Sequence, residues 1–175
     1  MNIPKVTNST GTIHLMFLMG LLLLALTISG CALSGSESGS SSIVFSAGSD
    51  DDVDIYTIDE ETGDPVRLTS ADGNDFAPAW SPNNSKIAFL SERNGDSALW
   101  VMDSLGDSKS QISGAGVEVV YFRWSPDSSR IGVEIVEDGN HSIHVIIVES
   151  KESIALTARG EDVRLGDWSP DGQWL

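Results

Sequence analysis

The sequence is poor in cysteine and in basic residues. Its 175 residues include one cysteine, Cys31, which excludes a disulfide within the chain and a zinc site built from cysteines. Only 10 Lys and Arg residues stand against 26 Asp and Glu residues, which gives a formal net charge of −16. A surface of this sign repels phosphate backbones, so nucleic acid is a poor candidate partner.

Motifs that would indicate an enzyme are also missing. The sequence contains no phosphate-binding loop, no dinucleotide fingerprint and no activated serine. His141 and His144 are three residues apart on an expected strand, which places them on opposite faces, where they cannot hold one ion together. Four aspartates lie between residues 50 and 54, but Ile55 stands where a helical calcium loop needs glycine. We therefore expect no catalytic residue, no metal and no cofactor.

A short Trp-Ser-Pro box occurs three times at a constant spacing. The tryptophans are 124 − 80 = 44 and 168 − 124 = 44 residues apart, and apolar columns such as Ile43, Ile87 and Ile131 share the same period. The box residues are Trp80, Pro82, Trp124, Pro126, Trp168 and Pro170. A fixed period of this length is typical of a β-propeller, with one four-stranded blade in each repeat.

Each repeat predicts the same order of strands. After the box come a second strand (86–91 or 130–136), a hairpin at Asn94-Gly95 or Asp138-Gly139, and a third strand (98–102 or 142–148). Short fourth strands are expected to end at Leu68-Thr69, Ile112-Ser113 and Leu156-Thr157. The sequence therefore predicts an all-β fold, an incomplete propeller of about three four-stranded antiparallel blades.

The first and third strands give further expectations. Because Ile43 aligns with Ile87, the array begins at the second strand of a blade, without that blade's first strand. The third strands are apolar on both faces, which favours strands buried on both sides between stacked sheets. We therefore interpret the box tryptophans as filling the space between neighbouring blades.

The N-terminus predicts an address at the bacterial cell envelope. Residues 13–28 are almost wholly apolar and precede Ser29-Gly30-Cys31, which resembles a bacterial lipobox. We expect residues 1–31 to be a lipoprotein signal peptide, Cys31 to be lipidated, and the Ser- and Gly-rich residues 32–42 to form a tether. The protein would be extracytoplasmic and anchored to a membrane, and the residue after Cys31 weakly favours the outer membrane. An ordinary secretory signal and an uncleaved anchor helix are the alternatives.

The repeat pattern over residues 43–175 resembles the TolB-type propeller repeat. Its best copy runs from Trp80 to Ser113, with Trp-Ser-Pro, then Ile-Ala-Phe, then Leu-Trp-Val-Met-Asp. The chain departs from TolB in three ways: it carries a lipobox, it has a tether in place of an α/β domain, and it encodes about three blades where TolB has six. The resemblance implies the fold, and it implies function only weakly, because the repeat recurs in many extracytoplasmic proteins.

The sequence leaves several functions open. In the repeat register Leu175 opens a second strand, and three blades cannot close a ring, so we expect a chain truncated at its C-terminus. A dimer of two half-rings is the alternative, and the one extra strand counts against it. The resemblance favours a scaffold for envelope proteins or peptides. The alternative is the propeller part of a prolyl-oligopeptidase-like peptidase, and a sugar-polymer lyase with metal-binding histidines elsewhere is a third possibility.

Overall fold

The computed structural model describes residues 42–49, 52–158 and 162–175, and every regular element in these residues is a β-strand. The strands are β1 (Ser42–Ser49), β2 (Asp52–Asp59), β3 (Pro65–Arg67), β4 (Asp75–Trp80), β5 (Lys86–Ser91), β6 (Ala98–Asp103), β7 (Ser110–Gln111), β8 (Glu118–Trp124), β9 (Arg130–Glu137), β10 (Asn140–Ile147) and β11 (Ser153–Ala155). No helix in the described part of the chain is long and apolar enough to cross a membrane.

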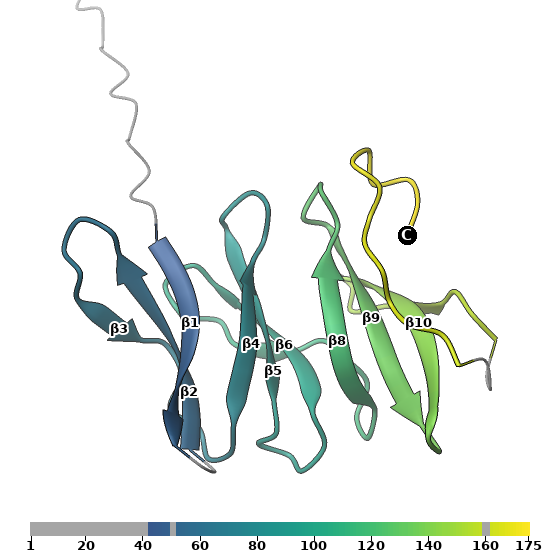
Figure 1. Cartoon of the computed structure of the whole chain (residues 1–175), viewed down its shortest axis with the longest axis horizontal. Coiled ribbons are helices and arrows are strands. Elements are labelled where there is room, and N and C mark those ends of the chain that lie inside the picture. Colours follow the sequence, from purple (N-terminus) through teal and green to yellow (C-terminus); the bar gives the residue numbers. More distant parts are fainter. Residues whose placement is uncertain (1–41, 50–51, 159–161) are drawn as a thin grey trace, which may run out of the picture. The chain divides into compact units, whose positions relative to one another are not determined.

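The strands form three sheets in which each strand pairs with the next along the chain (Figure 1). The first sheet is β1-β2-β3, the second is β4 to β7, and the third is β8 to β11, all with antiparallel pairing. This confirms the predicted all-β fold with repeated antiparallel sheets. It also confirms that the first sheet has three strands, because its chain enters at the position of a second strand.

Two hairpins differ in how closely they follow the prediction. Asp138 and Gly139 both take positive φ, 52° and 78°, and make the two-residue turn expected between β9 and β10. Between β5 and β6, only Gly95 has a positive φ, 102°, and its N–H donates to the Glu92 carbonyl at 2.8 Å. The predicted Asn94-Gly95 turn is therefore part of a longer loop over residues 92–97.

The fourth strands are shorter than predicted. They end at Arg67, Gln111 and Ala155, each before the Leu-Thr type pair that was expected to close them. In all three repeats the hydroxyl of this pair, in place of a backbone carbonyl, accepts a backbone N–H of the third strand. These bonds run from Ile55 to Thr69 at 2.9 Å, from Leu99 to Ser113 at 3.0 Å and from Ile143 to Thr157 at 3.0 Å.

The apolar core lies between the sheets, in two clusters on either side of the second sheet. Leu99 and Val101 of β6 belong to the larger cluster, shared with Ile131 and Val133 of the third sheet. Met102, on the opposite face of β6, belongs to the smaller cluster, shared with the first sheet. The two-faced burial predicted for the third strands is therefore correct for β6, and each sheet relies on its neighbour for burial.

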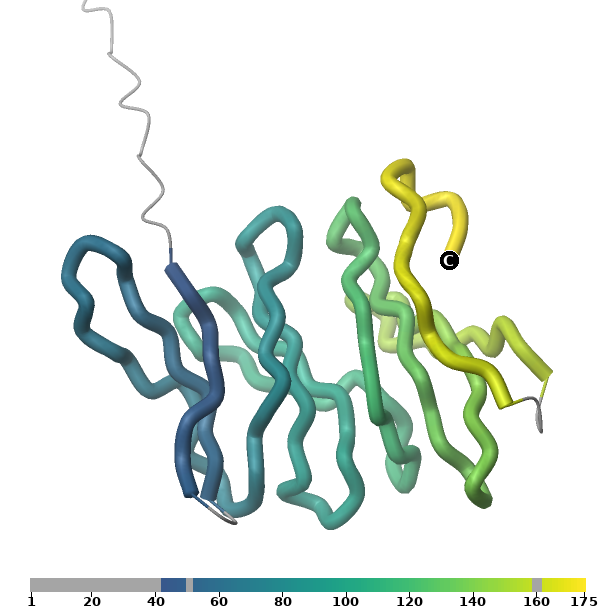
Figure 2. Tube along the Cα trace, viewed as in Figure 1, coloured from purple at the N-terminus to yellow at the C-terminus, as the bar shows by residue number. Residues whose placement is uncertain are grey.

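Residues 162–175 run beside the third sheet without joining a ladder (Figure 2). Leu165 and Leu175 pack against Gly132, where an added Cβ would lie 3.1 Å from the Leu175 side chain. In the repeat register the segment has the position of a first strand, and Leu175 has the position at which a second strand opens. A strand requires a ladder partner, and the described residues offer none on that side.

Candidate functional site

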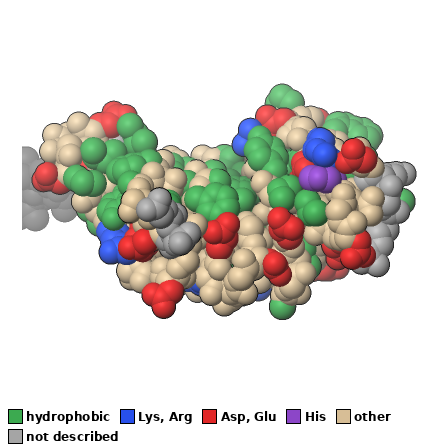
Figure 3. Space-filling view, turned by 60° about the horizontal axis from the view of Figure 1, so that its bottom comes forward, with side chains coloured by type: hydrophobic (Ala, Val, Ile, Leu, Met, Phe, Trp, Pro, Cys, Tyr) green, Lys and Arg blue, Asp and Glu red, His purple; other side chains and the backbone are tan. Residues whose placement is uncertain are grey.

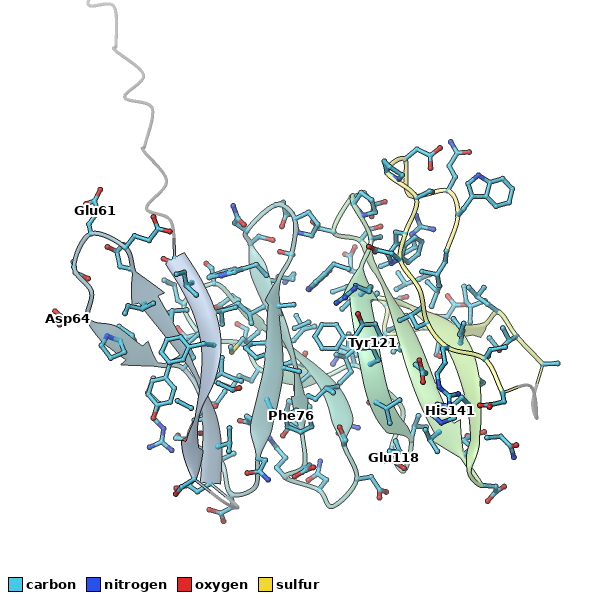
Figure 4. The ribbon with its side chains drawn as sticks, viewed as in Figure 1. Glu61, Asp64, Phe76, Glu118, Tyr121 and His141 are labelled. Atoms are coloured by element: carbon cyan, nitrogen blue, oxygen red, sulfur yellow. The ribbon has the colours of Figure 1, made fainter. Side chains whose placement is uncertain are left out.

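A groove opens between the second and third sheets, along the first strand of each. Both sheets line this groove, which has a volume of about 200 Å³. Its lining residues are Ala77, Pro78 and Ala79 of β4, Leu90 of β5, and Val120, Tyr121, Phe122 and Arg123 of β8. Figure 4 shows Tyr121 on β8, with Phe76 lower on β4.

Irregular backbone on both sides shapes this groove. The β4–β5 ladder shifts register between Phe76 and Ala79, and Ala77 has a φ of 50°. Pro78 lacks an N–H, so it fits a strand only at an edge or a bulge. The β8–β9 ladder shifts register between Val119 and Tyr121. Bulges re-aim side chains, and here they flank the groove in both sheets.

The groove combines an apolar floor with one cation. Leu90 and Phe122 are buried at 2% and 6% exposure, while Val120 is 38% exposed. The guanidinium of Arg123 lies 4.5 Å from the centre of the Tyr121 ring, which is within cation–π range. The other described arginines each contact a carboxylate, whereas Arg123 has no carboxylate partner among the described residues.

The three predicted tryptophans make the same contact with the sheet before them. The indole N–H of Trp124 donates to the Ala79 carbonyl at 3.2 Å, and that of Trp168 donates to the Arg123 carbonyl at 3.1 Å. Trp80 donates to the Ser42 carbonyl of β1 at 3.1 Å, because the described residues of the first sheet begin at the position of a second strand. Each box tryptophan therefore ties its own repeat to the preceding one.

The rest of the box forms a tight turn closed by side chains. Pro82, Pro126 and Pro170 take the second position of turns in which the box serine carbonyl accepts the N–H three residues on. In the third-sheet box, Ser125 Oγ donates to Asp127 Oδ1 at 2.6 Å, and that oxygen accepts the Ser129 N–H at 3.0 Å. These bonds, led by Ser125, lower the pKa of Asp127 to about 2.

The other residues singled out in the sequence either lie outside the described part of the chain or have structural partners within it. Cys31, Asp50 and Asp51 lie outside the described residues. Asp54 is buried and pairs with Arg67 and with Thr69 Oγ1 instead of facing a cation site. Within the described ranges, no group of three or more His, Cys, Asp or Glu side chains is placed to hold a metal ion.

The structure gives His141 a contact that the sequence interpretation missed. It lies in β10, and its Nδ1 is 2.7 Å from Oε1 of Glu134, which is 5% exposed. The other oxygen of Glu134 accepts the Leu165 N–H at 2.8 Å. The sequence contained a sign of this contact, because the charged Glu134 aligns in the 44-residue repeat with the apolar Leu90.

Another buried carboxylate, Asp75, belongs to the second sheet. Asp75 has no exposed surface, and Arg93 donates to both its oxygens at 2.9 and 2.8 Å. The same guanidinium lies 4.2 Å from the Trp100 ring centre. The third sheet has Val119 and Glu137 at the corresponding positions, so this ion pair is not a property of the repeat.

Acidic side chains dominate the charged surface. In the space-filling view Asp and Glu side chains are spread over the exposed face, with few Lys or Arg side chains among them (Figure 3). This distribution agrees with the net charge of −16. The unpaired cation of the groove therefore stands out electrostatically from its surroundings.

Solved structures resemble the chain over three quarters of its length. The putative TolB from Agrobacterium tumefaciens matches with a TM-score of 0.63 and 22% identity, over 75% of this chain and 51% of that chain. The fold is that of part of a TolB-like β-propeller. TolB from Acinetobacter baumannii matches with a TM-score of 0.62 and 23% identity, over 75% of this chain and 33% of that chain. The tricorn protease matches with a TM-score of 0.62 and 18% identity, over 75% of this chain and 13% of that chain.

These likenesses establish the fold and not the activity. No protein-family model matches the chain. The chain spans about half the length of the Agrobacterium protein and about a third of the Acinetobacter protein. The similar structures include both TolB proteins and a protease, so a TolB-like propeller segment is compatible with more than one function.

Proposed function

We propose that the chain is a lipid-anchored, non-enzymatic scaffold of the bacterial cell envelope that binds a protein or peptide. The observation that carries this proposal is the groove between β4 and β8, with its apolar floor and unpaired Arg123. Pockets that bind ligands combine apolar lining with a few polar groups that fix orientation. The groove contains an aromatic ring and an arginine, which are the side-chain types enriched at binding hot spots.

Site-specific photo-crosslinking tests the binding function. A benzophenone side chain replaces Val120, which borders the groove, in the full chain in bacterial cells. We expect one discrete adduct with an envelope protein or peptide, identified by mass spectrometry. The matched control carries the same group at Leu105, which is 81% exposed and remote from the groove in sequence. Equal adducts at both positions, or none at position 120, would contradict the proposal.

The envelope address rests on the sequence of the N-terminus. The sole cysteine, Cys31, follows an apolar run and the small residues Ser29 and Gly30. Two or more acyl chains at this position give stable membrane anchoring. A Cys31→Ser chain should lose labelling by a fatty-acid probe and should leave the membrane fraction. Undiminished labelling would refute the lipid anchor and would leave the proposed binding at the groove unaffected.

The propeller part of a peptidase is the second candidate function. The resemblance to the tricorn protease, with a TM-score of 0.62, favours it. In this case the groove would guide a peptide substrate to a catalytic domain elsewhere in a longer chain. Sequencing the gene past codon 175 separates the two: a Gly-x-Ser-x-Gly elbow after further repeats favours the peptidase. A stop codon after further repeats alone favours the scaffold.

A further inference from the structure

We propose that the groove between β4 and β8 recognises the C-terminal carboxylate of an extended peptide that ends in an apolar residue. This inference rests on the proposed peptide-binding function and names the chemistry of its ligand. The carboxylate would pair with Arg123, and the terminal side chain would lie over the apolar floor at Leu90 and Phe122.

The first argument is the state of Arg123. Its side chain is exposed, and its guanidinium carbon lies over the Tyr121 ring at 4.5 Å from the ring centre, a contact that does not use the hydrogen-bond donors. In an acidic molecule, arginines readily find carboxylates, as Arg93 finds Asp75 at 2.8 Å. Arg123 has no such partner among the described residues, which leaves its fork available for a carboxylate from a ligand.

The second argument is the size and lining of the groove. A volume of about 200 Å³ holds one or two side chains, and most of the lining side chains are apolar. A C-terminal residue carries its carboxylate and its side chain on the same Cα. A peptide end therefore presents both groups from one residue, which suits a groove lined by Arg123 and by apolar side chains.

The third argument is the sign of the surrounding charge. The net charge of −16 repels a ligand that carries several negative charges. A single terminal carboxylate beside apolar atoms meets less repulsion than an acidic run, and it gains a charge-assisted bond with Arg123. The groove is therefore matched to one carboxylate and not to a polyanion.

Peptide titration tests the proposal. A dye-labelled six-residue peptide ending in leucine is titrated against the full chain, in its free-acid and amidated forms, by fluorescence anisotropy. We expect the acid to bind at least about tenfold more tightly than the amide, a difference of about 1.4 kcal/mol. Arg123→Gln should abolish this difference, and Arg123→Lys should retain part of it. Lys109→Gln removes the same charge outside the groove and should leave the preference unchanged.

The outcomes separate this proposal from the broader one. Equal binding of acid and amide by the unaltered chain would overturn carboxylate recognition and leave peptide binding intact. An amidated peptide with an internal aspartate that binds as well as the free acid would overturn the C-terminal assignment. Binding of neither peptide, together with no adduct at position 120, would overturn both proposals. Circular dichroism of Arg123→Gln confirms that any loss of preference occurs in a folded chain.

Discussion

The indole N–H of Trp124 links two repeats through one hydrogen bond and a large buried ring. Trp124 is 9% exposed and donates to the Ala79 carbonyl at 3.2 Å. Trp124→Ala should reduce the free energy of unfolding by about 3–5 kcal/mol, because it leaves a cavity between the second and third sheets. Trp124→Phe should cost less, because it keeps a ring and removes about 1 kcal/mol of hydrogen bonding.

Urea unfolding followed by far-ultraviolet circular dichroism measures these losses. Trp168→Phe is the matched control, because Trp168 makes the equivalent bond to Arg123 at 3.1 Å in a more exposed setting. Its loss should be smaller than that of Trp124→Phe. A negligible effect of Trp124→Ala would mean that the ring does not support the contact between the sheets.

Asp127 makes the stability of the folded chain depend on pH. The Ser125 hydroxyl, then Ser129, hold the pKa of Asp127 at about 2, below its ordinary value of 3.8. A carboxyl with a lowered folded-state pKa contributes stability above pH 3.8, and that contribution is lost as the pH falls through about 2. The ¹³C shift of the Asp127 carboxyl should therefore titrate with a midpoint near 2.

The second repeat supplies the control for this prediction. Asn83 occupies the position of Asp127, and its Oδ1 accepts the Ser85 N–H at 3.1 Å in the same way. Asp127→Asn should therefore remain folded at neutral pH and should show a flatter acid dependence of stability between pH 3.8 and about 2. An unchanged acid dependence would show that the Asp127 carboxylate does not contribute to it.

Among the elements, the second sheet depends on the ion pair between β4 and the loop after β5. Arg93→Met leaves Asp75 buried and unpaired, so the free energy of unfolding should fall by about 3–5 kcal/mol. The double change Asp75→Val, Arg93→Met should recover most of this loss, because Val119 occupies the Asp75 position in the third sheet. Chemical denaturation measures both variants, and a double variant as unstable as the single one would contradict this account.

The strand order was predictable because the spacing of 44 residues places equivalent positions in equivalent sheets. The three-stranded first sheet of the described residues followed from the alignment of Ile43 with Ile87. The ends of β3, β7 and β11 were not predicted, because hydroxyls such as Thr69 Oγ1 compete for the third-strand N–H groups. Such local side-chain bonds leave no trace in hydrophobic periodicity.

The groove was not predictable from the sequence. It depends on register shifts at Phe76 and Val119, and a bulge does not interrupt the period of the repeat. Arg123 appears in the sequence only as the residue before the box. Its lack of a carboxylate partner emerges once the other arginines are placed in space.

As a whole, the described molecule is an array in which each sheet contacts its sequence neighbours. The apolar clusters lie between sheets, and the box tryptophans hydrogen-bond from one repeat to the one before. Stability in such an array is approximately a sum of repeat and interface contributions. Removing one complete repeat should therefore preserve the fold of the rest, whereas removing a partial repeat should not.

Deletion of residues 84–127 tests this claim most directly. The deletion removes 127 − 84 + 1 = 44 residues and joins Asn83 to Ser128, which restores an intact box turn. We predict a cooperative urea transition with a smaller slope than that of the full chain, because less surface becomes exposed on unfolding. A deletion four residues shorter, which disrupts the register, should give no cooperative transition. Loss of cooperative unfolding in both variants would contradict the account of modular, stacked blades.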